Sequence, residues 1–161
     1  MNRMYAYTMQ LMNNNTAYVL VGAPGSGKST WARGFAKLQP VVIIAGDSFA
    51  SESWVEMHDR VLDELVEHVG ELVILDGTHY DRESRLGAWV TLRSMGWKTV
   101  NAVVVHPPLE VCIANNALRS KVVPRHEIME MHRRVEKSLK KIEAEGFSSV
   151  VYALEETEVE S

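Results

Sequence analysis

Short apolar runs alternate with amphipathic stretches along the chain. The apolar runs predict buried strands over residues 17–21, 41–45, 72–75, 99–105 and 148–153. The stretches between them carry apolar residues at helical spacing and predict helices over residues 29–38, 52–69, 82–95, 109–118 and 125–145. Strands that alternate with helices pair in parallel through right-handed crossovers. We therefore expect an α/β fold, a three-layer sandwich around a central parallel sheet of about five strands.

Length and composition fit one folded unit. The chain has 161 residues, of which 46% are hydrophobic and 24% charged, and it contains neither an internal repeat nor a linker rich in proline or glycine. We expect a single domain over residues 1–161, with a flexible N-terminal extension over residues 1–15 and an acidic tail over residues 155–161. The apolar runs are far shorter than the roughly 20 residues of a membrane-spanning helix, and the one cysteine, Cys112, has no internal partner for a disulfide. These features predict a cytoplasmic protein without a membrane segment.

Charge is segregated along the chain. The formal net charge is −4, yet residues 46–76 hold nine acids and one base, whereas residues 119–141 hold eight bases and three acids. The basic segment has the charge to hold a polyanion such as nucleic acid. Two solvated helix faces would give the same pattern, so charge alone selects no partner.

The segment over residues 22–30, Gly-Ala-Pro-Gly-Ser-Gly-Lys-Ser-Thr, matches the P-loop pattern G-x-x-x-x-G-K-[ST] and lies between a predicted strand and a predicted helix. The backbone amides of such a loop converge on phosphate oxygens at the positive end of the helix. Lys28 would reach the β- and γ-phosphates, Ser29 would offer its hydroxyl to Mg²⁺, and Thr30 belongs to the first helical turn. The pattern predicts that a nucleoside triphosphate is bound by Gly22, Ala23, Pro24, Gly25, Ser26, Gly27, Lys28, Ser29 and Thr30.

Two acids follow predicted strands. Asp47 comes after the run 41–45, and Asp76 comes after the run 72–75. The carboxyl ends of parallel strands line the ligand crevice of an open sheet, so both carboxylates are expected to face the phosphates. We assign Asp47 as the general base that takes the proton of an attacking hydroxyl, and Asp76 as the carboxylate near Mg²⁺ that holds a water molecule beside the metal. An N-cap or a turn is the structural alternative for each.

These residues resemble the polynucleotide 5′-hydroxyl kinases of the phage type, within a broader group of small P-loop kinases that includes zeta-toxin-like enzymes. The similarity covers most of the chain. It includes the P-loop and first helix over residues 22–33 and the sequence Asp-Gly-Thr-His over residues 76–79, which is similar to the family's D-x-T-N element. Three further segments are similar as well: 82–89, 96–98 and 122–124.

The resemblance implies transfer of the γ-phosphate of ATP to a hydroxyl, with Mg²⁺ as the metal and the 5′-hydroxyl of DNA or RNA as the first choice of acceptor. Asp47 matches the family's general base. A lid over residues 115–124 would bring Arg119 onto the triphosphate, with Lys121 beside it, although an exposed loop base is the alternative for Arg119. Ala50 stands where the family usually has an arginine for the acceptor's 3′-phosphate. A small metabolite or a hydroxymethylated base in DNA is therefore the alternative acceptor, and a nucleotide-hydrolysing switch is the alternative from another class.

Other polar and aromatic residues are weighed by their position. Candidates to contact the acceptor are the residues at and after the second acid: Asp76, Thr78, His79 and Arg82. Arg85 is a further candidate to touch an acceptor phosphate. The alternative for it is local pairing with Asp81, the predicted N-cap of the helix 82–95, or with Glu83. Apolar helical positions predict a place in the core, rather than a role in stacking bases, for three tryptophans: Trp31, Trp54 and Trp89.

Overall fold

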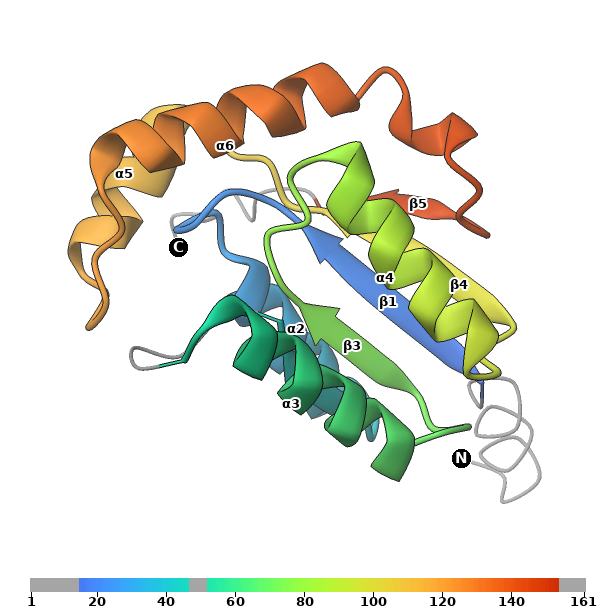
Figure 1. Cartoon of the computed structure of the whole chain (residues 1–161). Helices are drawn as coiled ribbons and strands as arrows, with labels where there is room; N and C mark the ends of the chain where they lie inside the picture. Colours follow the sequence, from blue (N-terminus) through green and yellow to red (C-terminus); the bar gives the residue numbers. More distant parts are fainter. Residues whose placement is uncertain (1–14, 47–51, 154–161) are drawn as a thin grey trace.

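The computed structural model describes residues 15–46 and 52–153, and these contain one five-stranded sheet (Figure 1). Neighbouring strands pair in parallel in the order β2-β3-β1-β4-β5. The strands are β1 (Thr16–Val21), β2 (Val42–Ala45), β3 (Val73–Asp76), β4 (Thr99–Val104) and β5 (Val150–Tyr152). Because β1 is central, the loop that follows it lies in the middle of the carboxyl edge of the sheet.

Helices cover both faces of the sheet. Along β1, Val19 lies in one core cluster with Leu65 and Leu92, whereas Leu20 lies in a second cluster with Ala32. Figure 1 shows α2 behind the sheet, α3 and α4 in front of it, and α6 across the top of the view. The predicted three-layer α/β sandwich is confirmed. The helices are α2 (Lys28–Leu38), α3 (Trp54–Glu67), α4 (Arg82–Ser94), α5 (Leu109–Ala117) and α6 (Arg125–Ser138).

Side-chain caps fix where α3 and α4 begin. The Glu56 amide donates to Ser53 Oγ over 3.2 Å and the Ser53 amide donates to the Glu56 carboxylate over 2.9 Å, which forms a capping box. Asp81 caps α4 by accepting a hydrogen bond of 2.9 Å from the Ser84 amide, as predicted. Burial raises the pKa of the Asp81 carboxyl, but the hydrogen bonds from Ser84 and the charge of nearby arginines outweigh burial, so this pKa lies below its ordinary value.

The helix predicted over residues 125–145 is too long. α6 ends at Ser138, and a short 3₁₀ helix (Ile142–Ala144) follows. Between them the chain tightens, because the Lys141 amide donates to the carbonyl three residues back, that of Ser138, over 2.9 Å. The tighter turn brings Ile142 into the core, where it is fully buried in one cluster with Val135.

Two of the three tryptophans predicted in the core lie there, and one does not. Trp31 and Trp89 pack against the core, as expected. Trp54 is 71% exposed, so its predicted core position is wrong. It is the first residue of α3, and the contacts of this helix with the core are made further along, at Val61 and Leu65.

The N-terminal extension, apart from Asn15, and the acidic tail lie outside the described residues. These two features and the single domain over residues 1–161 stay predictions. Within residues 15–46 and 52–153, no helix combines the length and the apolar character that crossing a membrane requires.

Candidate nucleotide and acceptor site

The P-loop turns tightly because two of its glycines adopt left-handed backbone angles. Gly25 has a φ of 79°, and Gly27, the N-cap of α2, has a φ of 100°. A Cβ on Gly25 would lie 2.3 Å from the carbonyl oxygen of Cys112 in α5, so only glycine fits between the loop and that helix. The loop leads into the N-terminus of α2, which attracts negative charge. Together these features give the turn and the helix end that phosphate binding requires.

Lys28 is buried inside this loop. It is 6% exposed, and its Nζ donates a hydrogen bond of 3.2 Å to the Ala23 carbonyl oxygen. A buried ammonium group is costly unless carbonyl oxygens or anions surround it, so this position favours a cation that meets phosphate. Ser26 Oγ in the same loop is also buried and has no hydrogen-bond partner among the described residues. Both polar groups are therefore placed to contact an anion in the loop.

The two residues predicted on the side of the metal lie together. Ser29 Oγ donates a hydrogen bond of 2.8 Å to Asp76 Oδ2, which joins the first turn of α2 to the end of β3. The second carboxylate oxygen, Asp76 Oδ1, is buried and has no hydrogen-bond partner among the described residues. Hydroxyl and carboxylate oxygens are the ligands that Mg²⁺ prefers, so this pair fits Mg²⁺. Thr30 is exposed beside them and accepts a hydrogen bond of 3.4 Å from Arg33.

The loop after β3 is hydrogen-bonded to the start of the P-loop. The Gly22 amide donates to the Thr78 carbonyl oxygen over 2.9 Å. His79 has a left-handed φ of 40°, and its Nδ1 lies 2.7 Å from the Leu20 carbonyl oxygen. Because a carbonyl oxygen only accepts hydrogen bonds, Nδ1 carries the proton and donates. The structure thus brings Thr78 and His79 to the P-loop and fixes the His79 ring on the backbone of β1.

The predicted general base lies outside the described residues. β2 ends at Ala45, and the Gly46 amide donates to the Asp76 carbonyl oxygen over 2.6 Å. The chain therefore enters the segment 47–51 beside Asp76, at the carboxyl edge of the sheet. Asp47 and Ala50 belong to that segment, and their roles stay predictions.

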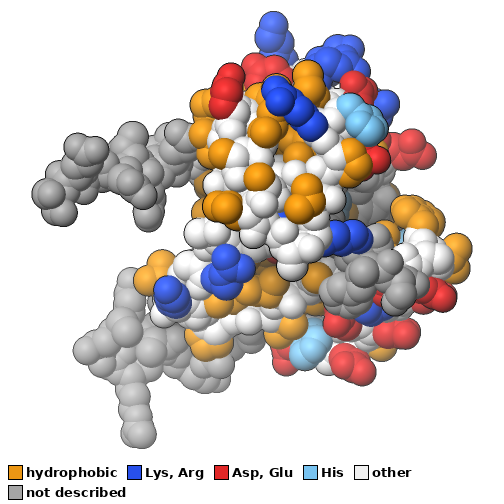
Figure 2. Space-filling view, turned by 90° about the vertical axis from the view of Figure 1, so that its left-hand side faces the viewer, with side chains coloured by type: hydrophobic (Ala, Val, Ile, Leu, Met, Phe, Trp, Pro, Cys, Tyr) orange, Lys and Arg blue, Asp and Glu red, His pale blue; other side chains and the backbone are white. Residues whose placement is uncertain are grey.

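A cleft of about 910 Å³ opens beside the P-loop, where Pro24 lines it. This volume is in the range of pockets that hold small ligands. Residues of α3, of α4 and of the segment from the end of α5 into α6 line the cleft. Figure 1 shows α3 in the lower part of the view and α5 and α6 in the upper part. Figure 2 shows Asp and Glu side chains gathered over α3 and Lys and Arg side chains over the upper part. Arg119 and Lys121 are exposed and line the cleft, together with Thr78 and His79, so the predicted lid bases share one cleft with the predicted acceptor residues.

One side chain closes the base of the lid loop, residues 117–122. Asn116 is buried, donates from Nδ2 to the Val123 carbonyl oxygen over 2.8 Å, and accepts at Oδ1 from the Val123 amide over 3.0 Å. Asn115 donates to the Gly25 carbonyl oxygen over 3.0 Å, which joins α5 to the P-loop. Sequence reasoning missed both residues. The available signal was a pair of asparagines before a basic loop, because asparagine amides often pair with backbone groups at turns.

Arg85 is a buried structural residue. It is 1% exposed, and its guanidinium forms a bidentate pair with Glu145 at 2.7 and 2.8 Å. Its ion-pair partner among the described residues is Glu145 and not Asp81 or Glu83, so the predicted local pair is wrong. The break after α6 explains the difference, because it turns Glu145 back toward α4. Arg85 also does not line the cleft, so the structure does not bring it to an acceptor there. Arg82, predicted near the acceptor, lines a separate small cavity beside Glu145 and is not brought to the cleft.

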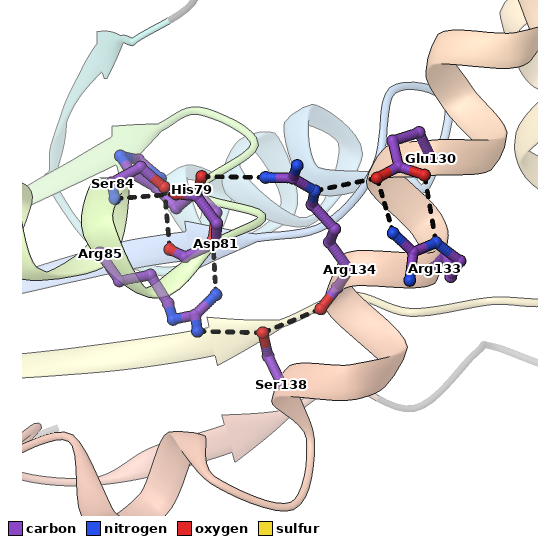
Figure 3. A network of polar contacts seen from close by, with 8 residues as sticks. All are labelled: His79, Asp81, Ser84, Arg85, Glu130, Arg133, Arg134 and Ser138. Atoms are coloured by element: carbon purple, nitrogen blue, oxygen red, sulfur yellow. Dashed lines mark hydrogen bonds and ion pairs between the residues drawn. The ribbon is translucent and has the colours of Figure 1, made fainter.

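The same guanidinium holds the loop after β3. Arg85 donates to the His79 carbonyl oxygen and to Ser138 Oγ, each over 3.0 Å, and Ser138 Oγ donates to the Arg134 carbonyl oxygen over 2.9 Å (Figure 3). Arg134 also reaches Asp81 at 3.5 Å. Helix α6 is thus connected to the loop that carries His79.

Some of the charge in the basic segment 119–141 is already compensated within α6. Arg133 and Arg134 donate hydrogen bonds to Glu130 and lower the pKa of that carboxyl to about 2 (Figure 3). An approaching polyanion would compete with Glu130 for these two arginines. The lid bases are therefore better placed than the middle of α6 to meet a phosphate in the cleft.

A family model described as AAA domain matches residues 18–138 of the chain. Comparison of the sequence with curated proteins finds no match.

Three solved structures illustrate the shared fold. Kti12 of Chaetomium thermophilum, in complex with ADP-AlF3, has 16% identity and a TM-score of 0.63 over 87% of this chain and 89% of that chain. A gluconokinase from Sinorhizobium meliloti has 16% identity and a TM-score of 0.58 over 86% of this chain and 81% of that chain. A fungal RNA kinase has 15% identity and a TM-score of 0.62 over 86% of this chain but only 38% of that chain. At these identities the likeness shows a common P-loop kinase-like fold.

Proposed function

The chain belongs to the AAA domain family, and on that premise we propose that it is an ATP-dependent kinase that transfers the γ-phosphate to a hydroxyl. One observation carries the proposal: Ser29 Oγ and Asp76 Oδ2 are hydrogen-bonded at 2.8 Å, close to the buried Lys28 and next to a cleft with room for an acceptor. A triphosphate and a second substrate would meet at this edge of the sheet.

Each site residue has one task in the proposed transfer. Lys28 and the P-loop amides hold the β- and γ-phosphates. Ser29 and Asp76 would hold Mg²⁺, which neutralises phosphate charge when bound. Asp47 takes the proton of the acceptor hydroxyl as its oxygen bonds to the γ-phosphorus, and the bond from that phosphorus to the β–γ bridging oxygen breaks to leave ADP. Arg119 contributes its planar guanidinium from the lid to the charge on the transferring group.

We propose the 5′-hydroxyl of DNA or RNA as the acceptor, in line with the resemblance to phage-type polynucleotide kinases. The two walls of the cleft support this choice. The lid wall carries Arg119 and Lys121, which suit the phosphates of a polynucleotide, and the α3 wall carries apolar and aromatic side chains, which suit a base. A fungal RNA kinase shares the fold.

A small metabolite, or a hydroxymethylated base within DNA, is the second candidate acceptor. The observation in its favour is Ala50, which replaces the arginine that the resemblance leads us to expect for the acceptor's 3′-phosphate. A gluconokinase shares the fold. A small acceptor would need fewer phosphate contacts than a polynucleotide end.

The test supplies γ-labelled ATP and Mg²⁺ with separate pools of 5′-hydroxyl DNA, 5′-hydroxyl RNA, nucleosides and sugars. We expect label in an oligonucleotide pool. Label only in sugars or nucleosides would favour the second candidate, and label only in inorganic phosphate would favour a hydrolysing switch.

The dependence of KM on salt concentration is an independent test of whether the acceptor is a nucleic acid. Each phosphate that the protein neutralises adds about 0.7 to 0.9 to the slope of log affinity against log salt concentration, so the KM for an oligonucleotide should rise steeply with salt. A flat response would overturn the nucleic-acid assignment.

A further inference from the structure

An exposed aromatic pair lies on the α3 wall of the cleft. Trp54 is 71% exposed, and its ring stacks on that of His58 with 5.6 Å between ring centroids and 3° between ring planes. Both residues line the cleft that also contains Thr78, His79 and Arg119. The two rings are therefore nearly parallel, open to solvent, and within the space assigned to the acceptor.

The fold does not explain this tryptophan. The start of α3 is fixed by the capping box of Ser53 and Glu56, which needs no side chain at position 54. The core contacts of the helix are made by Val61 and Leu65. Single exposed hydrophobic side chains are ordinary on protein surfaces. What distinguishes Trp54 is that its ring is stacked on that of His58 and lines a cleft, an arrangement that suits a planar ligand.

We infer that Trp54, supported from one side by His58, is a stacking platform for the nucleobase of the nucleotide that carries the acceptor hydroxyl. This inference rests on the proposed kinase function. An indole presents a flat apolar face that stacks on any nucleobase, and stacking contributes affinity without selecting the base. His58 limits the freedom of the indole, which lowers the ordering required when a base binds.

The positions of the lysine and arginine side chains in the cleft favour one direction for the acceptor. Both that line it, Arg119 and Lys121, belong to the lid loop, whereas the α3 residues that line it are apolar or aromatic. Phosphates are therefore attracted toward the lid rather than toward the platform. The base thus lies toward α3, and the sugar-phosphate backbone lies toward the lid.

The experiment compares two 5′-hydroxyl oligonucleotides that differ only at the terminal nucleotide, one with a base and one abasic. Binding is measured by equilibrium dialysis in the absence of ATP, and transfer is measured separately with labelled ATP. For the wild type we expect the acceptor with a base to bind about 5- to 150-fold more tightly, which is the range for stacking of one base on an aromatic side chain.

Variants then assign this preference to the platform. Trp54→Ala should remove most of the preference and raise KM for the acceptor with a base, with kcat and ATP affinity changed little, whereas Trp54→Phe should restore part of it. Val55→Ala is the matched control, because Val55 is the next residue of α3, is 64% exposed, and does not line the cleft.

The outcomes separate the two proposals. Equal binding of the two acceptors by the wild type, or a preference that Trp54→Ala leaves intact, would overturn the platform even if transfer occurs. A preference for the base that depends on Trp54, without transfer to either oligonucleotide, would support the platform and overturn the polynucleotide kinase function.

Discussion

The nucleotide half and the acceptor half of the site are held in place to different degrees. In the nucleotide half Lys28 is 6% exposed, Ser29 is bonded to Asp76, and the Gly22 amide is bonded to the loop after β3. In the acceptor half Trp54 is 71% exposed at a helix end, and the lid bases lie on a surface loop. On the proposed function, backbone and buried groups would preorganise phosphate binding, whereas acceptor choice would rest on exposed side chains that can change without disturbing the fold.

The largest effect is expected in the nucleotide half, from Lys28→Ala. Transfer should fall by at least about 10⁵-fold, the upper end of what one cation supplies in phosphoryl transfer, because on the proposed function Lys28 would contact the phosphates throughout the reaction. Steady-state assays with labelled ATP measure the loss, and circular dichroism should show an intact fold. Lys37→Ala is the control, since Lys37 lies exposed in the last turn of the same helix. Turnover within threefold of the wild type would exclude this role.

The second effect tests the lid. Arg119→Ala should slow turnover by about 10³- to 10⁵-fold, as loss of an arginine finger does, and Arg119→Lys should restore little because an ammonium cannot span two phosphate oxygens. Single-turnover kinetics isolate the transfer step. Arg125→Ala provides the comparison, because Arg125 is exposed at the start of α6 and does not line the cleft. Equal losses in the two alanine variants would make Arg119 an ordinary surface base.

The third effect tests the proposed general base. Asp47→Asn should lower kcat by about 10²- to 10⁴-fold, the usual contribution of a general base, with ATP affinity nearly unchanged. The comparison of kcat with the ATP dissociation constant is the measurement, and Asp59→Asn on the exposed face of α3 is the control. If ATP affinity falls as much as kcat, Asp47 acts on the metal and belongs to the nucleotide half.

The smallest effect on turnover is expected from Arg85→Met, which acts on stability. This change leaves Glu145 buried without its cation and should cost about 3 to 5 kcal/mol of unfolding free energy, measured by urea denaturation. Arg93→Met, at an exposed position of the same helix, should cost much less. A double-mutant cycle with Glu145→Gln isolates the pair, and a coupling energy near zero would show that the two side chains contribute independently.

The strands and the P-loop were predictable because their signals are local. Strands buried on both faces appear as apolar runs, and a P-loop is a contiguous motif whose flanks can be checked. The rule that strand ends meet at one edge predicted that Asp76 lies at the ligand crevice, but its hydrogen bond with Ser29 was not predicted. Side chains that pair across long sequence distances leave no such local signal. This is why the ion pair of Arg85 with Glu145 was not predicted. Periodicity placed Trp54 on the inner face of α3, but it does not tell how far along a helix the core extends.

The two hydrogen bonds between Asn116 and Val123 make the lid loop a closed ring. Residues 117–122 are fixed at both ends, so Arg119 can move only within the arc that this short ring allows. If Arg119 meets the triphosphate as proposed, the ends of its loop are already fixed. The free-energy cost of lost conformational entropy is then mainly that of one long side chain, about 2 kcal/mol, rather than that of a whole segment. Amide hydrogen exchange should distinguish the fixed end of the loop from its tip. We expect slow exchange at the Val123 amide and rapid exchange at the amides of the loop tip.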